Sequence, residues 1–149
     1  MKQTFHYLSM ANHSMIQKKL MERIKNSGLT LGQPKVLDYL GENDGANQKE
    51  IAAACHIEPG SLTSILNRME EKEMIERRIL NGNRRTFHVF LTAYGKELQK
   101  KVDTAFQEIE KEALEGINEQ EYTAFMNTFQ KMYQNLTDAE KGKKEVGNE

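Results

Sequence analysis

Cysteine, proline and tryptophan are scarce in this chain, which has one Cys, two Pro and no Trp. The single cysteine, Cys55, excludes an intramolecular disulfide and is typical of a reducing compartment. Long apolar runs are also missing: no segment approaches the roughly 20 residues of a membrane-spanning helix, and the N-terminus lacks the apolar core of a signal peptide. These absences predict a cytoplasmic protein without a membrane partner.

The sequence also lacks the usual signatures of an enzyme. It has no glycine-rich phosphate-binding loop, and no nucleophile paired with a base stands out. Its four histidines are not at paired metal-ligand spacing, and no cysteine cluster joins them: His6, His13, His56 and His88. At 149 residues, the chain has room for one domain but not for a second, catalytic domain of ordinary size. We therefore expect no catalysis, no metal and no cofactor.

Charge is unevenly distributed along the chain, although the net charge is only −1. Residues 77–92 contain four Arg and no Asp or Glu, whereas residues 96–149 contain eight Lys against twelve Asp or Glu. A basic segment on an acidic scaffold concentrates positive potential where it could meet the phosphates of nucleic acid. Ordinary solvated surface is the alternative explanation of this asymmetry.

Residues 47–72 have the pattern of a helix-turn-helix unit. Asn47 and Glu50 form a capping box before a short helix that ends near Cys55, and Pro59 starts a longer helix that runs to about Lys72. The second helix exposes small and polar side chains at Gly60, Ser61, Thr63, Ser64, Asn67 and Arg68. A helix with such a face is suited to enter the major groove of DNA.

A β-hairpin is predicted after this unit. Residues 75–80 and 84–91 are strand-like, and Asn81-Gly82 between them is a strong signal for a hairpin turn. The alternation in the second strand directs Phe87, Val89 and Leu91 towards the core and leaves Arg85, Thr86 and His88 near the solvent.

Helices are also predicted on both sides of this winged core. Residues 4–26 have apolar side chains near helical spacing, and a shorter helix starts at Thr30, where Gln33 reaches back as in a capping box. Thr92 caps a long helix to about residue 116, and Asn118 caps a final one. The final helix carries an apolar stripe formed by Tyr122, Phe125, Met126, Phe129, Met132 and Leu136.

The apolar stripes outside the winged core predict a homodimer. A winged helix is closed by its own helices and hairpin, so further apolar helix faces need a partner. We assign residues 1–28 and 93–137 to dimerisation helices, 29–92 to a DNA-binding lobe, and 138–149 to a frayed polar tail. The fold class is mainly α with a small β-hairpin wing. In the alternative arrangement, these helices fold back on the core of their own chain.

Over most of its length, the chain resembles the MarR family of winged helix-turn-helix transcriptional regulators. The resemblance is carried by LTLGQPKVLDYL (29–40), IAAACHIEPGSLTSILNRMEEKEMIERR (51–78) and NRRTFHVFLTAYG (83–95). It implies a homodimer whose recognition helices lie in the major groove of double-stranded DNA and whose wing arginines lie in the adjacent minor groove. It also implies a small-molecule effector that binds between the dimerisation helices and the DNA-binding lobe and releases DNA.

Three residues depart from the family pattern. Asn83 stands where the family usually has Asp, which weakens the charge partner of the wing arginine. His56 replaces a common Gly in the turn, where we expect strain rather than failure of the turn. Glu73 replaces the Gly that usually follows the recognition helix, and we expect that helix to end less sharply.

The predicted DNA-binding residues lie on the recognition helix and on the wing. Arg84 and Arg85 suit phosphates and a narrow, negative minor groove, next to Asn83. Gly60 and Ser61 place backbone N–H groups near a phosphate at the helix N-terminus. The remaining helix positions contact base edges or the DNA backbone, and the sequence leaves open which does which: Thr63, Ser64, Asn67 and Arg68.

We expect a ligand-responsive repressor that binds a pseudo-palindromic operator. One alternative is a redox regulator that uses Cys55, although the inward position of this residue favours a buried core thiol. A second alternative is a helical protein-interaction module that has lost DNA binding, an idea supported by the acidic net charge and by Asn83.

Overall fold

The computed structural model of the protein describes residues 3–80, 82 and 86–147. In these residues the elements are α1 (Phe5–Arg23), α2 (Gln33–Glu42), α3 (Gln48–Cys55), α4 (Pro59–Glu71), β1 (Ile75–Ile79), β2 (Phe87–Leu91), α5 (Ala93–Ala113) and α6 (Glu119–Gly147). The chain divides into two compact units, Met1–Ile109 and Glu110–Glu149. The mainly helical fold class with a two-stranded hairpin is confirmed.

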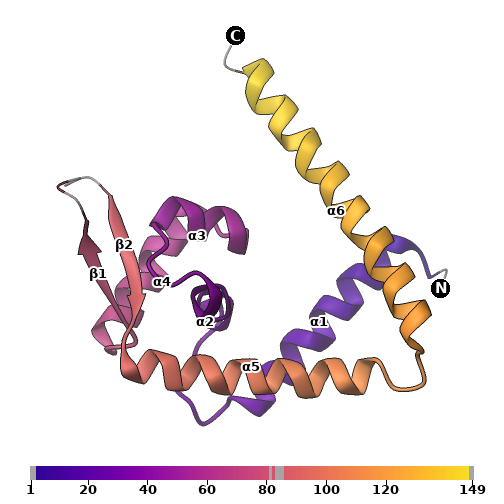
Figure 1. The fold of residues 1–149 in the computed structure, drawn as a ribbon, viewed down its shortest axis with the longest axis horizontal. Coiled ribbons are helices and arrows are strands. Elements are labelled where there is room, and N and C mark those ends of the chain that lie inside the picture. The colour runs from indigo at the N-terminus through magenta and orange to yellow at the C-terminus, as the bar shows by residue number, and fades with distance from the viewer. Residues whose placement is uncertain (1–2, 81, 83–85, 148–149) are drawn as a thin grey trace. The chain divides into compact units, whose positions relative to one another are not determined.

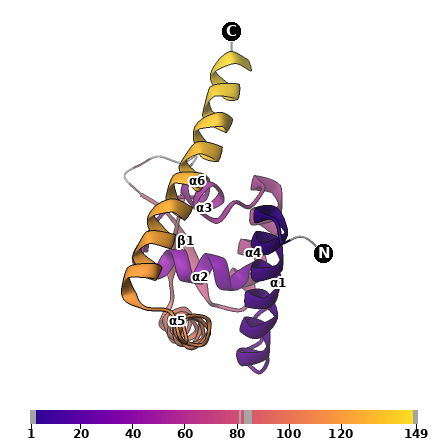
Figure 2. The same cartoon turned by 90° about the vertical axis from the view of Figure 1, so that its right-hand side faces the viewer.

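The first unit is built around a helix-turn-helix lobe. Helix α3 lies beside both α2 and α4, and the antiparallel hairpin packs along α4 (Figure 1, Figure 2). Its apolar core draws on every element from α1 to α5. The largest fully buried apolar side chains are Leu37, Leu40, Ile51, Leu62, Leu66, Met69, Met74, Ile75, Val36, Val89 and Val102.

Side-chain caps start several of these helices. The Thr4 hydroxyl accepts from the backbone N–H of Tyr7, 3.3 Å away, at the start of α1. Before α2, the Gln33 side chain accepts from the Thr30 N–H at 3.0 Å, as the capping-box pattern predicted, although the helix itself begins only at Gln33. The Asn118 side chain accepts from the N–H of Glu121 at 2.8 Å and starts α6. These helix starts can be predicted from the sequence because each capping pair consists of residues three positions apart.

The hairpin register differs from the turn that Asn81-Gly82 indicated. Ile75 pairs with Leu91, and Ile79 pairs with Phe87. The segment between the paired strands therefore runs from residue 80 to residue 86, which is longer than a two-residue turn. Apart from Gly82, the residues of the predicted tip lie outside the described part of the chain.

Two side chains of β2 differ in exposure from what strand alternation predicted. Phe87 is 44% exposed, whereas the alternation placed it in the core with Val89 and Leu91. His88, expected near the solvent, is half-buried and lies 2.8 Å through Nδ1 from the carbonyl oxygen of Gly45. His88 is covered because the segment before α3 joins the edge of β2, where the Val89 N–H donates to the Ala46 carbonyl at 2.9 Å. Phe87 is exposed at the end of the strand pairing, away from the core.

Helix α6 continues past the point where the sequence predicted a frayed tail. It runs to Gly147, although the polar character of residues 138–149 indicated fraying after Thr137. Alanine, glutamate and lysine have high helix propensity, and the Lys143 ammonium lies 3.7 Å from the Glu140 carboxylate one turn earlier. Local propensity continues the helix here, where the side chains of residues 138–143 are exposed.

Candidate nucleic-acid interface

Helix α4 presents a polar face opposite its buried stripe. Leu62, Leu66 and Met69 recur at helical spacing and are almost fully buried, which fixes the rotation of the helix on the lobe. All six residues that the sequence assigned to the DNA-facing side are exposed: Gly60, Ser61, Thr63, Ser64, Asn67 and Arg68. The helix-turn-helix geometry thus places the predicted donors and acceptors on one accessible surface.

The N-terminal end of α4 is open to a close approach. Pro59 occupies the first turn, and a Cβ added at Gly60 would meet no atom within 4 Å. The Thr63 hydroxyl donates to the Pro59 carbonyl at 3.0 Å, so its donor is used within the helix. The positive end of the helix dipole lies near Ser61, where the first turn has no acidic residue, although the N-cap residue before it is Glu58.

Both helices of the helix-turn-helix unit are followed by a non-glycine residue in the left-handed conformation. His56 has φ 53° and Glu73 has φ 59°. After α4, the Met74 N–H donates to the Met69 carbonyl at 2.9 Å, and the Glu73 N–H donates to the Glu70 carbonyl at 3.0 Å. This is a Schellman motif, so α4 ends sharply, and the expected poorly defined end is wrong. The strain expected at His56 agrees with its positive φ.

Arg77, which stands out in the sequence only as one of the four arginines of the wing segment, contacts the recognition helix. Its Nη2 donates to the Asn67 Oδ1 at 2.8 Å and to the Glu70 Oε1 at 3.1 Å, while its Nε donates to the Glu70 Oε2 at 3.2 Å. These hydrogen bonds, aided by the charge of Arg77 and opposed by partial burial, hold the pKa of Glu70 below its usual value. No local pattern signals this contact, because it joins different elements.

Arg78, the next wing arginine, is engaged in a different way. Its guanidinium bonds to the Glu76 carboxylate and lies over the Phe90 ring, 4.4 Å from the ring centre. The two arginines of β1 therefore have acidic partners, and the basic excess of the wing depends on its tip. The predicted tip residues Asn83, Arg84 and Arg85 lie outside the described residues.

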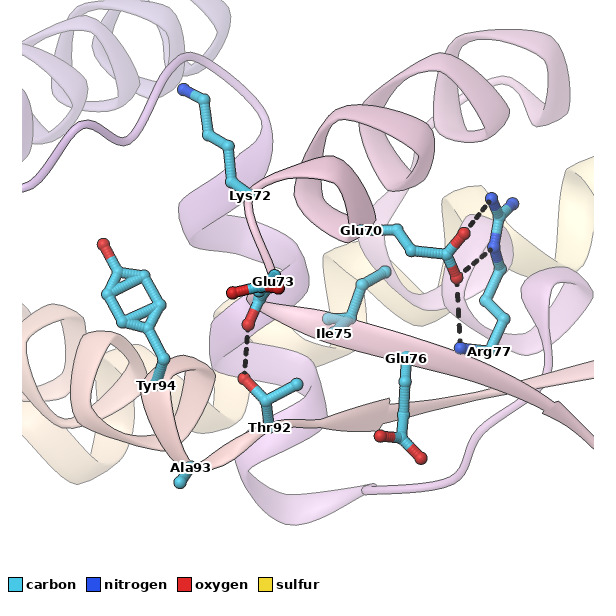
Figure 3. A pocket seen from close by; sticks show the side chains of 9 residues that line it. All are labelled: Glu70, Lys72, Glu73, Ile75, Glu76, Arg77, Thr92, Ala93 and Tyr94. Atoms are coloured by element: carbon cyan, nitrogen blue, oxygen red, sulfur yellow. Dashed lines mark hydrogen bonds and ion pairs between the residues drawn. The ribbon is translucent and has the colours of Figure 1, made fainter.

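A hollow of about 850 Å³ lies where α4, β1 and α5 meet (Figure 3). The Glu70 carboxylate and the Arg77 guanidinium face each other on one side of it, and Thr92 bonds to the Glu73 carbonyl at 2.6 Å on another (Figure 3). The other lining residues are Lys72, Ile75, Glu76, Ala93 and Tyr94. The hollow is an open surface feature next to the recognition helix, not an enclosed cavity.

Cys55 lies in the core of the helix-turn-helix unit. Its side chain is 7% exposed, and its Sγ lies 3.6 Å from the Lys35 carbonyl oxygen. Burial raises the pKa of the Cys55 thiol, although the nearby Lys35 charge opposes this shift. The prediction of a buried thiol is confirmed, and these surroundings disfavour the reactive thiolate.

The described part of the chain has neither a membrane-spanning helix nor a metal-binding cluster. No helix there is long and apolar enough to cross a membrane. No group of three or more His, Cys, Asp or Glu side chains is placed to hold a metal ion among the same residues.

This geometry defines a class of protein. A helix-turn-helix with an exposed polar second helix and an adjoining β-hairpin is the architecture of a winged-helix DNA-binding protein. The family model of the MarR family matches residues 29–87, which cover the lobe from just before α2 to the start of β2.

Similar proteins agree with this assignment. The HTH-type transcriptional regulator BilQ of Clostridium symbiosum is 25% identical over 132 residues, which are 89% of this chain and 92% of BilQ. A crystal structure of a MepR–DNA complex from S. aureus has a TM-score of 0.79 at 27% identity and covers 91% of this chain and 99% of that one. CouR of Rhodococcus jostii RHA1, solved with p-coumaroyl-CoA, has a TM-score of 0.75 at 18% identity, with 87% and 91% covered. The DNA-binding lobe of this chain therefore matches the MarR family model, and the chain is a DNA-binding transcriptional regulator.

Proposed function

We propose that the protein is a repressor that binds a pseudo-palindromic operator as a homodimer, with α4 of each protomer in a major groove. The observation that carries this proposal is the exposed face of α4, where hydroxyl, amide and guanidinium groups lie on a helix anchored by a buried apolar stripe. Such groups pair with base edges and phosphates. We propose a cytoplasmic regulator without enzymatic activity.

In the proposed complex, some residues of the protein contact the DNA phosphates and others contact the base edges. Gly60 and Ser61 bring backbone N–H groups and a small side chain to a phosphate at the positive end of α4. Ser64, Asn67 and Arg68 lie further along the exposed face and reach towards base edges. The wing residues Asn83, Arg84 and Arg85 would follow the adjacent minor groove. The Thr63 hydroxyl, already used within the helix, contributes its acceptor lone pairs.

Exposed apolar side chains on the outer helices support the homodimer. In α1, Phe5 is 51% exposed and Met10 is 68% exposed. In α6, Phe125 is 56% exposed and Leu136 is 64% exposed. Single exposed apolar residues are normal, but rows of them along helices of this length are typical of an interface. We propose that residues 1–28 and 93–137 form it, while 29–92 bind DNA.

We further propose that a small-molecule effector controls DNA release. CouR, a protein of the same fold, is solved with p-coumaroyl-CoA, which supports a ligand-responsive mechanism without indicating which ligand this protein binds. An effector that favours a spacing of the two α4 helices different from that of successive major grooves lowers DNA affinity by population shift.

Of the alternatives, a redox switch at Cys55 has less support than effector control. The thiol is buried and its pKa is raised, so little of it is thiolate at neutral pH. The protein-interaction alternative has less support than DNA binding, since the exposed hydroxyl, amide and guanidinium groups of α4 are those that pair with phosphates and base edges.

The test is fluorescence anisotropy with DNA from upstream of the protein's own gene and with scrambled DNA of equal length. We expect tight, sequence-dependent binding that weakens steeply with added salt, because basic side chains release counterions from the phosphates. An Arg84→Ala/Arg85→Ala variant should bind at least about tenfold more weakly with a smaller salt slope.

A control variant removes one positive charge at a site away from the wing. Lys143→Ala lies on α6, outside the proposed DNA-binding surface, and should bind like the unaltered protein. Equal and weak binding of both DNAs by all of the variants would contradict the proposed function. Loss of binding after mild peroxide treatment that is absent in Cys55→Ser would favour the redox alternative.

A further inference from the structure

The side chain of Asn67 is held in one orientation by the wing strand. Arg77 lies in β1 with its side chain only 18% exposed, and it bridges two residues that are one helical turn apart on α4. Its guanidinium binds both oxygens of the Glu70 carboxylate, as Figure 3 shows, and its Nη2 also binds the Asn67 Oδ1 at 2.8 Å. The backbone N–H of Arg77 adds a bond to the Glu70 Oε2 at 3.2 Å. The contact is thus fixed by several hydrogen bonds.

The chemistry of the guanidinium determines which end of the amide faces it. An arginine side chain has only hydrogen-bond donors, so the group it contacts must be an acceptor. Asn67 therefore turns its carbonyl oxygen to Arg77, and its NH₂ group is directed to the remaining side. Within the described residues, that NH₂ group has no hydrogen-bond partner, and Asn67 is exposed.

An amide held in this way discriminates between purines differently from a free one. A free asparagine recognises adenine with two bonds, by accepting from N6 and donating to N7. When its oxygen is already bonded to a charged donor, the amide offers mainly donors. Guanine presents two adjacent acceptors in the major groove, N7 and O6, and suits that arrangement.

We infer that Asn67 is a specificity-determining residue that reads guanine in each half-site, and that Arg77 is the positioning residue that directs its NH₂ group to the base. This inference rests on the proposed function, since it requires α4 in a major groove. Glu70 completes the arrangement, because its carboxylate holds the guanidinium in place at 3.1 Å and 3.2 Å.

The test measures competition binding with operator variants in which each base pair is substituted in turn. Four protein variants are compared with the unaltered protein: Asn67→Ala, Arg77→Gln, Arg77→Lys and the double variant Asn67→Ala/Arg77→Gln. Arg78→Gln is the matched control, because it removes the same charge from the same strand, and its guanidinium contacts Glu76 and Phe90 rather than α4. Circular dichroism establishes that each variant is folded.

We expect one position per half-site where replacing guanine by adenine, or by 7-deazaguanine, weakens binding by the unaltered protein about fivefold or more. Asn67→Ala should lose that preference. Arg77→Gln should lose it or shift it towards adenine at that position only, and the double variant should behave like Asn67→Ala. Arg77→Lys keeps the charge but lacks the fork that bridges both partners, so it should lose the preference as well.

Two outcomes would overturn the inference. The first is a set of base preferences in Arg77→Gln and Arg77→Lys identical to those of Arg78→Gln. The second is an Asn67→Ala variant that keeps every preference of the unaltered protein. The proposed function fails in a distinguishable way, since the unaltered protein would then show no sequence-dependent binding to any DNA.

Discussion

At the residue scale, Glu73 accepts a backbone conformation that glycine adopts more easily. Its φ of 59° belongs to the left-handed region, where a Cβ is crowded against the backbone. The Schellman hydrogen bonds at Met74 and Glu73 force this conformation on whichever residue follows α4. The strain at Glu73 is offset because these hydrogen bonds connect α4 to the fully buried Met74 and to β1.

Replacement of Glu73 by glycine should therefore stabilise the protein. We expect Glu73→Gly to raise the free energy of unfolding by up to about 1 kcal/mol, since the removed strain exceeds the extra entropy of an unfolded glycine. Urea denaturation followed by circular dichroism measures the change. Glu73→Ala, which removes the carboxylate and keeps the Cβ, serves as the control and should give no comparable gain. Equal gains in both variants would mean that the carboxylate, not the backbone, carries the cost.

The pair formed by Glu70 and Arg77 predicts a dependence of stability on pH. The pKa of Glu70 in the folded protein lies below its ordinary value of 4.5, chiefly because of the hydrogen bonds from the Arg77 side chain. The folded state then binds fewer protons than the unfolded state in the acid range. Its contribution to stability is complete above pH 4.5 and is lost as the pH falls through the folded pKa.

Glu70→Gln should be less stable than the unaltered protein at pH 6, and this difference should shrink as the pH is lowered to about 3. Thermal unfolding midpoints at a series of pH values give the measurement. Glu71→Gln, a change at the adjacent exposed residue outside the Arg77 contacts, is the control. A difference between Glu70→Gln and the unaltered protein that stays constant with pH would refute the assigned pKa shift.

At the scale of elements, Thr92 and Gly95 join the start of α5 to the end of α4. The Thr92 side-chain oxygen lies 3.1 Å from the Met74 carbonyl oxygen and accepts from the Gly95 N–H at 3.0 Å. A Cβ at Gly95 would collide with the Met74 carbonyl oxygen, which belongs to rigid backbone. Only glycine lets α5 approach the α4–β1 connection this closely.

Gly95→Ala should therefore destabilise the first unit by about 1–3 kcal/mol, because backbone must move to admit the methyl group. Gly60→Ala is the control in the same unit, since a Cβ there meets no atom within 4 Å and alanine has the higher helix propensity. The control should be as stable as the unaltered protein or more so. Chemical denaturation measures the free energy of unfolding of both variants. An equal change in Gly95→Ala and Gly60→Ala would contradict the close approach at Gly95.

At the scale of the whole molecule, α6 exposes a row of large apolar side chains, as α1 does. Its aromatic residues Phe125 and Phe129 stack with ring centres 5.0 Å apart and are 56% and 42% exposed. Two exposed stacked rings on a helix are typical of the centre of an interface. In the proposed two-fold dimer, we expect the two recognition helices to meet successive major grooves, which lie about 34 Å apart.

Phe125→Glu/Phe129→Glu should shift the protein from a dimer to a monomer of 17.2 kDa, because charges would replace apolar contacts at the proposed interface. Sedimentation equilibrium measures the mass, and operator affinity should fall at least about tenfold when the two half-sites are no longer linked. Asn127→Glu/Gln130→Glu adds the same charge at other exposed positions of α6 and should remain dimeric. A dimeric Phe variant would place the interface elsewhere.

The sequence by itself determined the helix-turn-helix unit, most helix starts and the exposed face of α4. These features depend on residues three or four positions apart, so capping and hydrophobic periodicity predict them from local physics. The predicted site residues of α4 are accordingly all exposed. The side chains at the wing tip, Asn83, Arg84 and Arg85, stay a prediction.

Only the tertiary structure decided how distant elements meet. The hairpin register, the half-buried His88 and the contacts of Arg77 with Asn67 and Glu70 join residues from different elements. No spacing rule predicts such contacts, because they depend on how α3, α4 and β2 pack around a shared apolar core. The orientation of the Asn67 amide, and with it the proposed preference for guanine, is therefore a property of the fold rather than of the recognition helix alone.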